Sequence, residues 1–273
     1  MKYCAIALIC ILSLGGLLSC GLEEYYYIDY IPRRDYESTR AILDLPSSST
    51  EGYNYFDNFI IFYRIYISES NASPGRPLES DSGLRSAISS AFNSDYNGLY
   101  SLTDITSTSV NTSNLENTFS NRNYFLLSLE GAAINNVLGS GSLGRRLYIA
   151  FPPNPGDQPT LTVYNPLTDG DPTDSAYTQP RYALQRAVAN QISGISFEAL
   201  PDRRFLNHPD LYNTANITSG RNADVAANSA ANLLYTYVSM YIAAKGRSTE
   251  MPPRIIYSQP TFIGIFLLAP SGN

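Results

Sequence analysis

The segment 55–68, YFDNFIIFYRIYIS, carries large apolar side chains over nearly its whole length. One stripe consists of every second residue: Phe59, Ile61, Tyr63, Ile65 and Ile67. The positions between them are also mostly large and apolar, with Arg64 as a charged exception. Alternation of β-branched and aromatic residues is typical of a β-strand, and apolar residues on both sides of it indicate that both faces are covered. The sequence therefore predicts a long strand that is buried on both faces.

Period-two patterns of this kind recur along the chain more often than helical ones. Further strands are predicted at 25–31, 123–129, 147–151, 160–164, 195–200, 233–243 and 255–268. Pro32 would end the first of these strands at a sheet edge, and Pro260 would break the last. Turn-forming residues in FPPNPGDQP and NPLTDGDPTD mark the clearest loops between the strands.

One segment fits a helix better than a strand. Leu84, Ile88 and Phe92 recur at every fourth position, after a Ser-Asp-Ser sequence that can cap a helix. Gly98 would end this helix. The spacing predicts an amphipathic helix that lies against a sheet.

The remaining segments complete a prediction of the fold. Segments 182–192 and 223–231 could form short helices, whereas 106–121 and the proline-rich 152–180 are predicted to be exposed loops. No internal repeat or long linker divides the chain. These patterns favour a single mainly β domain over 25–273, an antiparallel β-sandwich with a peripheral amphipathic helix.

The N-terminal segment has the features of a signal peptide. Lys2 gives it a short positive start, an apolar run follows at 4–14, and two glycines then favour the end of a helix. A transmembrane helix is the alternative, but residues 3–18 would reach about 24 Å, against roughly 30 Å of hydrocarbon. Residues 1–19 are therefore predicted to be a signal peptide that is removed.

The end of this segment, Leu17-Leu18-Ser19-Cys20, resembles the lipobox of bacterial lipoproteins. In that motif a leucine lies three positions before the cysteine and a small residue lies directly before it. Leu18 stands where the commonest pattern has a small residue. The resemblance implies that Cys20 becomes the first residue, carries the lipid anchor as acyl chains such as palmitate, and begins a short tether at 20–24. An ordinary secretory cleavage site is the competing interpretation.

Cysteine positions limit the chemistry of the mature chain. The three cysteines are Cys4, Cys10 and Cys20, so a chain that begins at Cys20 has no thiol besides the acylated one. This excludes a disulfide framework, a catalytic thiol and a cysteine-based metal site. Stability must then come from a hydrophobic core, for which the 254 residues left after removing 1–19 from 273 are sufficient.

Charge composition bears on the partners. Charged residues make up 15% of the chain, and loss of Lys2 changes the formal net charge from −6 to −7. A mildly acidic surface of this kind argues against nucleic acid as a partner, because the phosphate backbone requires a basic surface.

Three other parts of the chain are similar to a group of uncharacterised spirochaete-type lipoproteins. They are the helix candidate GLRSAISSAFNSDYNGL, the strand pair YVSMYIAAKG and PRIIYSQPTFIGIFLLAP, and the strand FIIFYRIYIS. This resemblance implies an envelope lipoprotein, and it supplies no catalytic residues to carry over.

Catalytic patterns are sparse. The one histidine, His208, lies in RRFLNHPDLY, where Pro209 favours a loop, and no G-x-S-x-G elbow accompanies it. One histidine without cysteines also supplies too few ligands for zinc. The segment GSGSLG at 139–144 lacks the lysine of a phosphate loop and predicts a flexible turn. We therefore expect no catalytic residue and no cofactor.

Three carboxylates lie close together in DGDPTD, at Asp169, Asp171 and Asp174. Oxygen ligands suit calcium, but the spacing differs from the helix–loop–helix calcium motif. A solvated turn is the preferred interpretation, calcium binding is the alternative, and no metal site is assigned. A carboxylate pair for glycoside hydrolysis cannot be singled out among the 24 acidic residues.

The 22 tyrosines, in a chain without tryptophan, allow two interpretations. An exposed tyrosine cluster could bind a protein or glycan, because the ring supplies contact area and the hydroxyl a hydrogen bond. The preferred interpretation is that tyrosine is simply a good strand residue.

These observations together predict a non-enzymatic, membrane-anchored lipoprotein of the bacterial envelope with a binding or structural role. Its partner would be a protein or a glycan, in addition to the membrane that holds the lipid. Gly21 follows the cysteine where an inner-membrane retention signal has Asp, which favours the outer membrane or the cell surface. The alternative function is an envelope hydrolase that uses carboxylate residues.

Overall fold

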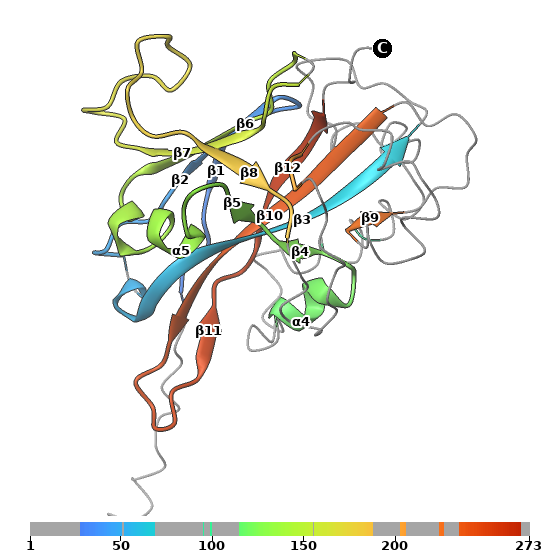
Figure 1. Ribbon diagram of the computed structural model, residues 1–273. Coiled ribbons are helices and arrows are strands. Elements are labelled where there is room, and N and C mark those ends of the chain that lie inside the picture. The colour runs from blue at the N-terminus through green and yellow to red at the C-terminus, as the bar shows by residue number, and fades with distance from the viewer. Residues whose placement is uncertain are drawn as a thin grey trace, which may run out of the picture.

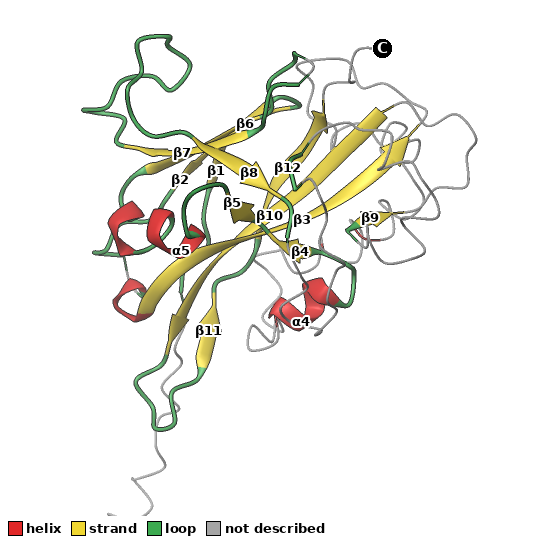
Figure 2. Ribbon diagram, in the orientation of Figure 1, coloured by secondary structure: helices red, strands yellow, loops and turns green. Residues whose placement is uncertain are grey.

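The computed structural model describes residues 28–50, 52–68, 95, 99, 115–154, 156–187, 203–205, 224–226 and 235–268. Strands dominate this part of the chain and form two six-stranded sheets (Figures 1 and 2). The strand pairs are antiparallel, except for one short parallel pair. The predicted class, a mainly β antiparallel sandwich, is therefore confirmed.

The first sheet has the strand order β1-β2-β6-β7-β8-β5. Its strands are β1 (Arg33–Glu37), β2 (Arg40–Asp44), β6 (Arg146–Ala150), β7 (Thr160–Tyr164), β8 (Tyr182–Gln185) and β5 (Ser128–Leu129). Burial alternates along β6, where Leu147 and Ile149 are buried and their neighbours are partly exposed. This sheet therefore covers the core with one face and meets solvent with the other.

The second sheet is built on two long strands, β3 (Phe56–Ser68) and β10 (Tyr235–Arg247), which pair along their length. They lie side by side in Figure 1. On its edge opposite β3, β10 pairs with β12 (Thr261–Leu268) along its first half and with β11 (Ile255–Tyr257) near its end. On its edge opposite β10, β3 pairs with the short strands β4 (Phe125–Leu126) and β9 (Val225–Ala226). The pairing with β9 is the parallel one.

The main core lies between the sheets. It includes Leu43, Leu147 and Leu161 from the first sheet, and Phe59, Ile61 and Val238 from the second. On the outer face of the second sheet, Ile60 and Phe62 pack with Phe119 of helix α4 (Leu115–Ser120). The rings of Phe62 and Phe119 stack with centroids 4.2 Å apart. β3 is thus buried on both faces, as its sequence predicts.

Most of the other strand predictions that fall on described residues are confirmed. The segments 55–68, 147–151 and 160–164 match β3, β6 and β7 to within one residue at each end, and the described part of 233–243 coincides with the first part of β10. Pro260 separates β11 from β12, as predicted. The candidate at 123–129 divides at Leu127, so that β4 joins the second sheet and β5 the first. The glycine–serine segment 139–144 forms a turn that contains the 3-10 helix η4 (Ser140–Ser142).

The strand predicted at 25–31 is wrong over the described residues 28–31, which belong to no ladder. Ile28 and Ile31 are both buried, at a spacing of three that a period-two pattern does not give. The first strand begins directly after Pro32 instead of ending there. β1 and β2 escaped prediction because RRDYE and RAILD mix charged and apolar residues, and pairing with each other and with β6 stabilises them.

The helices predicted at 182–192 and 223–231 are also wrong where the structure describes them. Residues 182–185 form β8, which pairs with β7 and β5, and β9 pairs with β3. The predicted loop 106–121 ends in α4, because Leu115 and Phe119 lie one helical turn apart and are both buried. Tertiary pairing and burial override local propensity in each case.

Two predicted elements lie outside the described residues. The strand candidate at 195–200 does so entirely. The amphipathic helix predicted at 84–98 does so except for Asp95, which is helical and buried.

Tyr36 of β1 joins the first sheet to β12 of the second. Its hydroxyl donates to the carbonyl oxygen of Ile265 and accepts the N–H of Ile265 at 2.7 Å. The ring lies on Gly264, whose φ of 155° strains any other residue. A Cβ on Gly264 would lie 2.6 Å from Cζ of Tyr36, inside contact distance. The close approach of the ring to the β12 backbone therefore requires glycine.

Gly264→Ala is expected to lower the free energy of unfolding by about 1–3 kcal/mol, because the added methyl group displaces the Tyr36 ring. Urea unfolding followed by circular dichroism measures this loss. Gly141→Ala is the matched control, since a Cβ there meets nothing within 4 Å. Equal losses in the two variants would show that the Tyr36 contact does not constrain this position.

Candidate functional site

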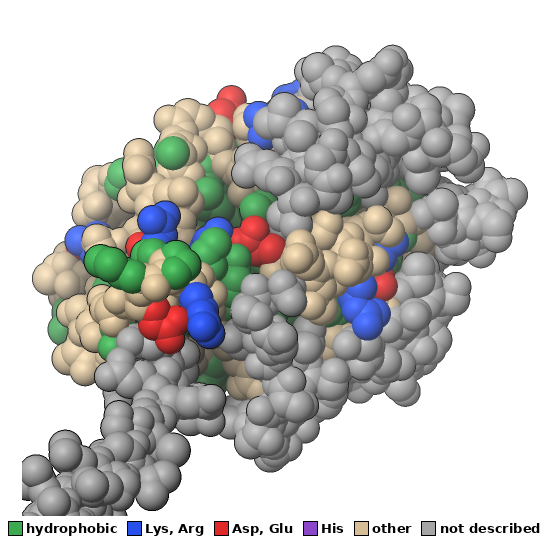
Figure 3. Space-filling model, turned by 90° about the horizontal axis from the view of Figure 1, so that it is seen from below, with side chains coloured by type: hydrophobic (Ala, Val, Ile, Leu, Met, Phe, Trp, Pro, Cys, Tyr) green, Lys and Arg blue, Asp and Glu red, His purple; other side chains and the backbone are tan. Residues whose placement is uncertain are grey.

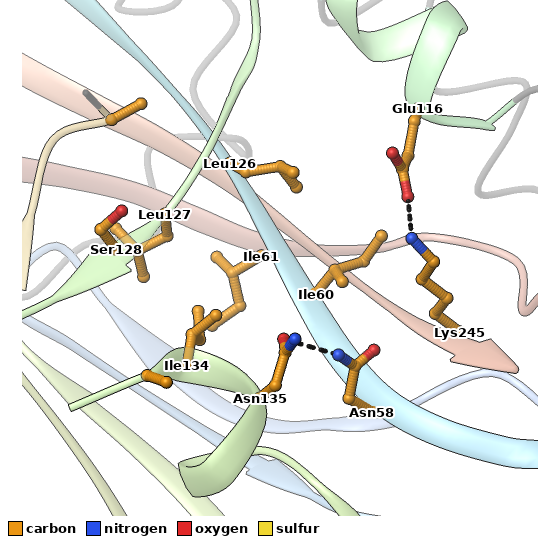
Figure 4. A pocket seen from close by; sticks show the side chains of 12 residues that line it. Asn58, Ile60, Ile61, Glu116, Leu126, Leu127, Ser128, Ile134, Asn135 and Lys245 are labelled. Atoms are coloured by element: carbon orange, nitrogen blue, oxygen red, sulfur yellow. Dashed lines mark hydrogen bonds and ion pairs between the residues drawn. The ribbon is translucent and has the colours of Figure 1, made fainter. Parts of the chain in front are cut away.

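A cleft of about 270 Å³ opens beside β3, and both helices α4 and α5 (Ile134–Val137) contribute to its lining (Figure 4). Its apolar part is aliphatic and consists of Ile60, Ile61, Leu126, Leu127, Ala133, Ile134 and Ala187. Its polar residues are Asn58, Glu116, Ser128, Asn135 and Lys245. Figure 4 shows two polar pairs, Asn58 with Asn135 and Glu116 with Lys245, and places Ser128 across the cleft from the second pair.

The cleft exists because the edge of β3 opposite β10 is paired over short stretches only. Phe59 N–H donates to the carbonyl oxygen of Leu138 at 2.8 Å, and Leu127 N–H donates to that of Ile61 at 2.8 Å. Between these two bonds, no described strand continues the ladder on this edge. Ile60 and Ile61, which lie at this interruption, contribute to the lining of the cleft.

An ion pair lies at one end of the cleft. Nζ of Lys245, from β10, is 2.7 Å from Oε1 of Glu116, from α4. The Tyr257 hydroxyl donates to the same oxygen at 2.5 Å. Burial and the Glu116 carboxylate hold the pKa of Tyr257 well above its usual value, so this hydroxyl remains a donor at neutral pH. The side chains of Lys245 and Glu116 are 28% and 20% exposed, so a ligand can reach them.

Two amides line the wall next to this pair. Nδ2 of Asn58 donates to Oδ1 of Asn135 at 2.6 Å. Oδ1 of Asn58 is buried and has no hydrogen-bond partner among the described residues. A buried acceptor without a donor costs about 1–3 kcal/mol. This oxygen is closed to solvent, so the amide that faces a ligand in the cleft is that of the exposed Asn135.

The composition of the cleft suits binding. The opposite charges of Glu116 and Lys245 balance, and the amides and Ser128 offer both donors and acceptors. None of the lining residues is aromatic, so a sugar ring would find no ring to stack on. An aliphatic side chain flanked by peptide groups would match the aliphatic floor and the polar rim.

A second polar cluster is enclosed in the main core. The Arg186 guanidinium binds the Asp224 carboxylate through two hydrogen bonds, one from Nε to Oδ2 at 2.8 Å. The Tyr63 hydroxyl donates to Oδ2 of Asp224 at 2.8 Å and accepts Ala187 N–H at 2.7 Å. Burial lowers the pKa of Arg186, but Asp224 outweighs this effect and raises it, so the arginine stays charged. With side chains 5% and 2% exposed, this pair ties strands together and is closed to substrates.

A third cluster lies on the outer face of the second sheet. The Tyr66 hydroxyl donates to Oδ2 of Asp95 at 2.7 Å, and Arg64 pairs with the same carboxylate. The Tyr124 hydroxyl lies 3.2 Å from that of Tyr66 and 3.0 Å from Oγ of Ser239. Burial raises the pKa of Tyr66 well above its usual value and that of Tyr124 to about 12.

The buried tyrosines predict a loss of stability in alkali. The ordinary pKa of 10.0 holds in the unfolded chain, and burial raises the pKa of Tyr63, Tyr66 and Tyr124 in the folded protein. Their contribution to the free energy of unfolding is complete below about pH 10. As the pH rises above 10, this contribution is lost by about 1.4 kcal/mol per pH unit for each tyrosine. Urea unfolding between about pH 8 and pH 11.5 measures this slope. Tyr66→Phe should flatten it, whereas Tyr30→Phe, at an exposed position, should not. A slope that Tyr66→Phe leaves unchanged would contradict the prediction.

The acidic residues singled out in the sequence each stabilise a local turn. Asp169, Asp171 and Asp174 accept backbone N–H groups from Asn165, Thr173 and Ala176 at 2.7, 2.8 and 2.9 Å. These backbone hydrogen bonds lower the pKa of Asp169 and of Asp171. The described residues contain no group of three acidic, histidine or cysteine side chains placed to hold a metal ion. The geometry therefore favours the turn interpretation over calcium.

Two other residues from the sequence prediction, Cys20 and His208, lie outside the described residues. The described tyrosines act mainly as core residues. Those that are buried are Tyr36, Tyr53, Tyr63, Tyr66, Tyr124, Tyr164, Tyr237, Tyr241 and Tyr257. This burial favours the strand interpretation over a tyrosine-rich binding face in the described part of the chain.

Sequence reasoning missed the residues of the cleft. Glu116 and Lys245 are 129 positions apart, and Glu116 falls in a segment predicted to be a loop. The local signal for α4 was the pair Leu115 and Phe119, which are one helical turn apart. Nothing local links this turn to β10, so the ion pair requires the tertiary structure.

The chain matches no protein-family model, no curated protein and no solved structure. Among the described residues, no helix is both long enough and apolar enough to cross a membrane. The function is therefore argued from the residues of this chain and their geometry.

Proposed function

We propose that the chain is a lipid-anchored, non-enzymatic protein of the bacterial envelope, and that it binds a partner through the cleft beside β3. The motif Leu17-Leu18-Ser19-Cys20 supports the anchor, with the lipid on Cys20. The outer membrane or the cell surface is the proposed location, because Gly21 follows the cysteine.

The cleft is the observation that carries the binding role. It combines an aliphatic floor with the accessible pair Glu116 and Lys245 and with the exposed amide of Asn135. A protein partner that inserts an aliphatic side chain would contact this floor and use the polar rim for its peptide groups.

No observation among the described residues favours the hydrolase alternative. The two buried carboxylates described, Asp95 and Asp224, are each held by an arginine, Arg64 and Arg186 respectively. Hydrolysis by paired carboxylates needs two such groups on either side of one substrate bond. We therefore retain the binding role as the proposal.

The anchor is tested with Cys20→Ala. This variant should stay unprocessed and take up no labelled palmitate, whereas the unchanged chain should be processed and labelled. Ser19→Ala is the matched control, because it keeps a small residue before the cysteine and should leave labelling intact. Palmitate uptake by Cys20→Ala would refute the anchor.

The cleft is tested with a photo-crosslinking residue at Ala133, an exposed position on its rim. In intact cells this position should give one discrete crosslinked product. The same probe at Leu167, which is 92% exposed and is absent from the cleft lining, is the control and should not give that product. Identical products from the two positions would count against the cleft as the binding site.

A further inference from the structure

We propose that the hairpin formed by the end of β10 and by β11 inserts its tip into the headgroup region of the membrane that holds the anchor. The tip comprises residues 248–254. The inference rests on the proposed lipid at Cys20, and it adds a second, protein-borne contact with the same membrane.

The tip and the adjoining first residue of β11 present apolar side chains to solvent. Met251 is 97% exposed and Ile255 is 46% exposed, two of the four large apolar side chains that are exposed in the described part of the chain. The turn that presents Met251 is ordered by hydrogen bonds. Ser248 N–H donates to the carbonyl oxygen of Arg254, and Arg254 N–H donates to Oγ of Ser248, both at 2.9 Å. An ordered turn with an apolar side chain at its tip can insert without a large loss of conformational entropy.

Basic residues flank these apolar side chains. The side chains of Arg247 and Arg254 are 71% and 78% exposed, and each forms a pair with one carboxylate, Asp57 or Glu250. Pairs at this exposure are weak, so lipid phosphate groups can replace the carboxylates. Figure 3 views this end of the molecule and shows hydrophobic side chains bordered by basic and acidic ones. Apolar residues with arginines beside them are typical of contacts at the membrane interface.

The hairpin and the proposed anchor lie at the same end of the domain. Ile28 is 3% exposed, and its Cδ1 lies 2.9 Å from where a Cβ on Gly246 would be. The chain that comes from Cys20 therefore joins the core at the base of the hairpin. The eight residue steps from Cys20 to Ile28 span at most roughly 28 Å.

The hairpin is long enough to reach the membrane surface to which this tether is attached. From Gly246 to Met251 it extends by at most roughly 17 Å, less than the longest reach of the tether. Figure 1 shows the hairpin projecting from one end of the domain, with the β7–β8 loop at the other end. A short tether at the base of the hairpin thus holds the apolar tip close to the bilayer and keeps the β7–β8 loop away from it.

The test uses the absence of other thiols in the mature chain. Met251→Cys is labelled with the environment-sensitive dye NBD on acylated protein in phosphatidylethanolamine–phosphatidylglycerol vesicles. Its emission should shift to shorter wavelength, and spin-labelled lipid should quench it at least about twofold more than at the control position. Leu167→Cys is that control, because Leu167 is equally apolar and 92% exposed but lies in the β7–β8 loop. Equal quenching at the two positions, or protection of residue 251 from aqueous iodide without quenching by the lipid, would overturn the inference.

A second arm separates this inference from the anchor. A Cys20→Ser chain that begins at residue 20 is held on nickel-chelating lipid through an N-terminal histidine tag. If the natural chain takes up no palmitate but residue 251 of the tagged chain is quenched, the hairpin contact stands and the anchor fails. If the acylated chain binds vesicles but residue 251 is not quenched, the anchor stands and the hairpin contact fails.

Discussion

Asp224→Asn is expected to lower the free energy of unfolding by about 3–5 kcal/mol, because it leaves the Arg186 guanidinium charged and buried without a counter-ion. The carboxylate accepts hydrogen bonds from Arg186 and from the Tyr63 hydroxyl. The neutral amide keeps the size of the side chain, so the loss reports charge and hydrogen bonding and not a cavity. Thermal and urea unfolding measure it.

Two comparisons sharpen this prediction. Glu250→Gln breaks an exposed pair with Arg254 and should cost less than about 0.5 kcal/mol. The double variant Arg186→Met with Asp224→Leu removes both charges and should recover most of the stability lost in Asp224→Asn. If the double variant is less stable than Asp224→Asn, the cost does not come from an isolated charge.

Ile61→Asp is expected to destabilise the protein by more than about 4 kcal/mol, and this loss can prevent folding altogether. Ile61 is fully buried, and it lies in the main core between the two sheets. A carboxylate at this position would have to be buried either charged and unpaired or protonated, and both states are costly. The soluble yield and the midpoint of thermal unfolding give the readout.

The control for this prediction is Leu167→Asp, at a position 92% exposed, which should leave the midpoint unchanged. Ile61→Val provides a variant that folds and should lose about 0.5–1.5 kcal/mol. A midpoint that Ile61→Asp leaves in place would mean that the stripe of β3 is not part of the core.

Local pattern was informative where each strand carries its own burial signal. β3 is apolar on both faces, and it is the strand that lies between the main core and the cluster with Phe119. β1 carries no such signal, since three of its five residues are exposed, and it is held by its pairing with β2 and by the contact of Tyr36 with β12. A strand that is stabilised by its neighbours cannot be recognised from its own residues.

The candidate site divides in the same way. The lipid-anchor motif at Cys20 is contiguous, so the sequence is sufficient to propose it. The cleft needs Glu116 from α4 and Lys245 from β10, and it opens where the edge of β3 lacks a ladder partner among the described residues. Neither the pairing register nor this gap is encoded in a local pattern.

The sequence by itself determined the mainly β class and the burial of β3 on both faces, because each depends on the periodicity of short segments. It is also the whole basis of the proposed lipid anchor at Cys20. The tertiary structure decided that 182–185 is a strand, that Asp224 neutralises Arg186 and that Ile28 enters the core beside Gly246. These features arise from contacts between segments far apart in the chain. Their free energy is gained only once the two sheets have packed, so no single segment carries a sign of it.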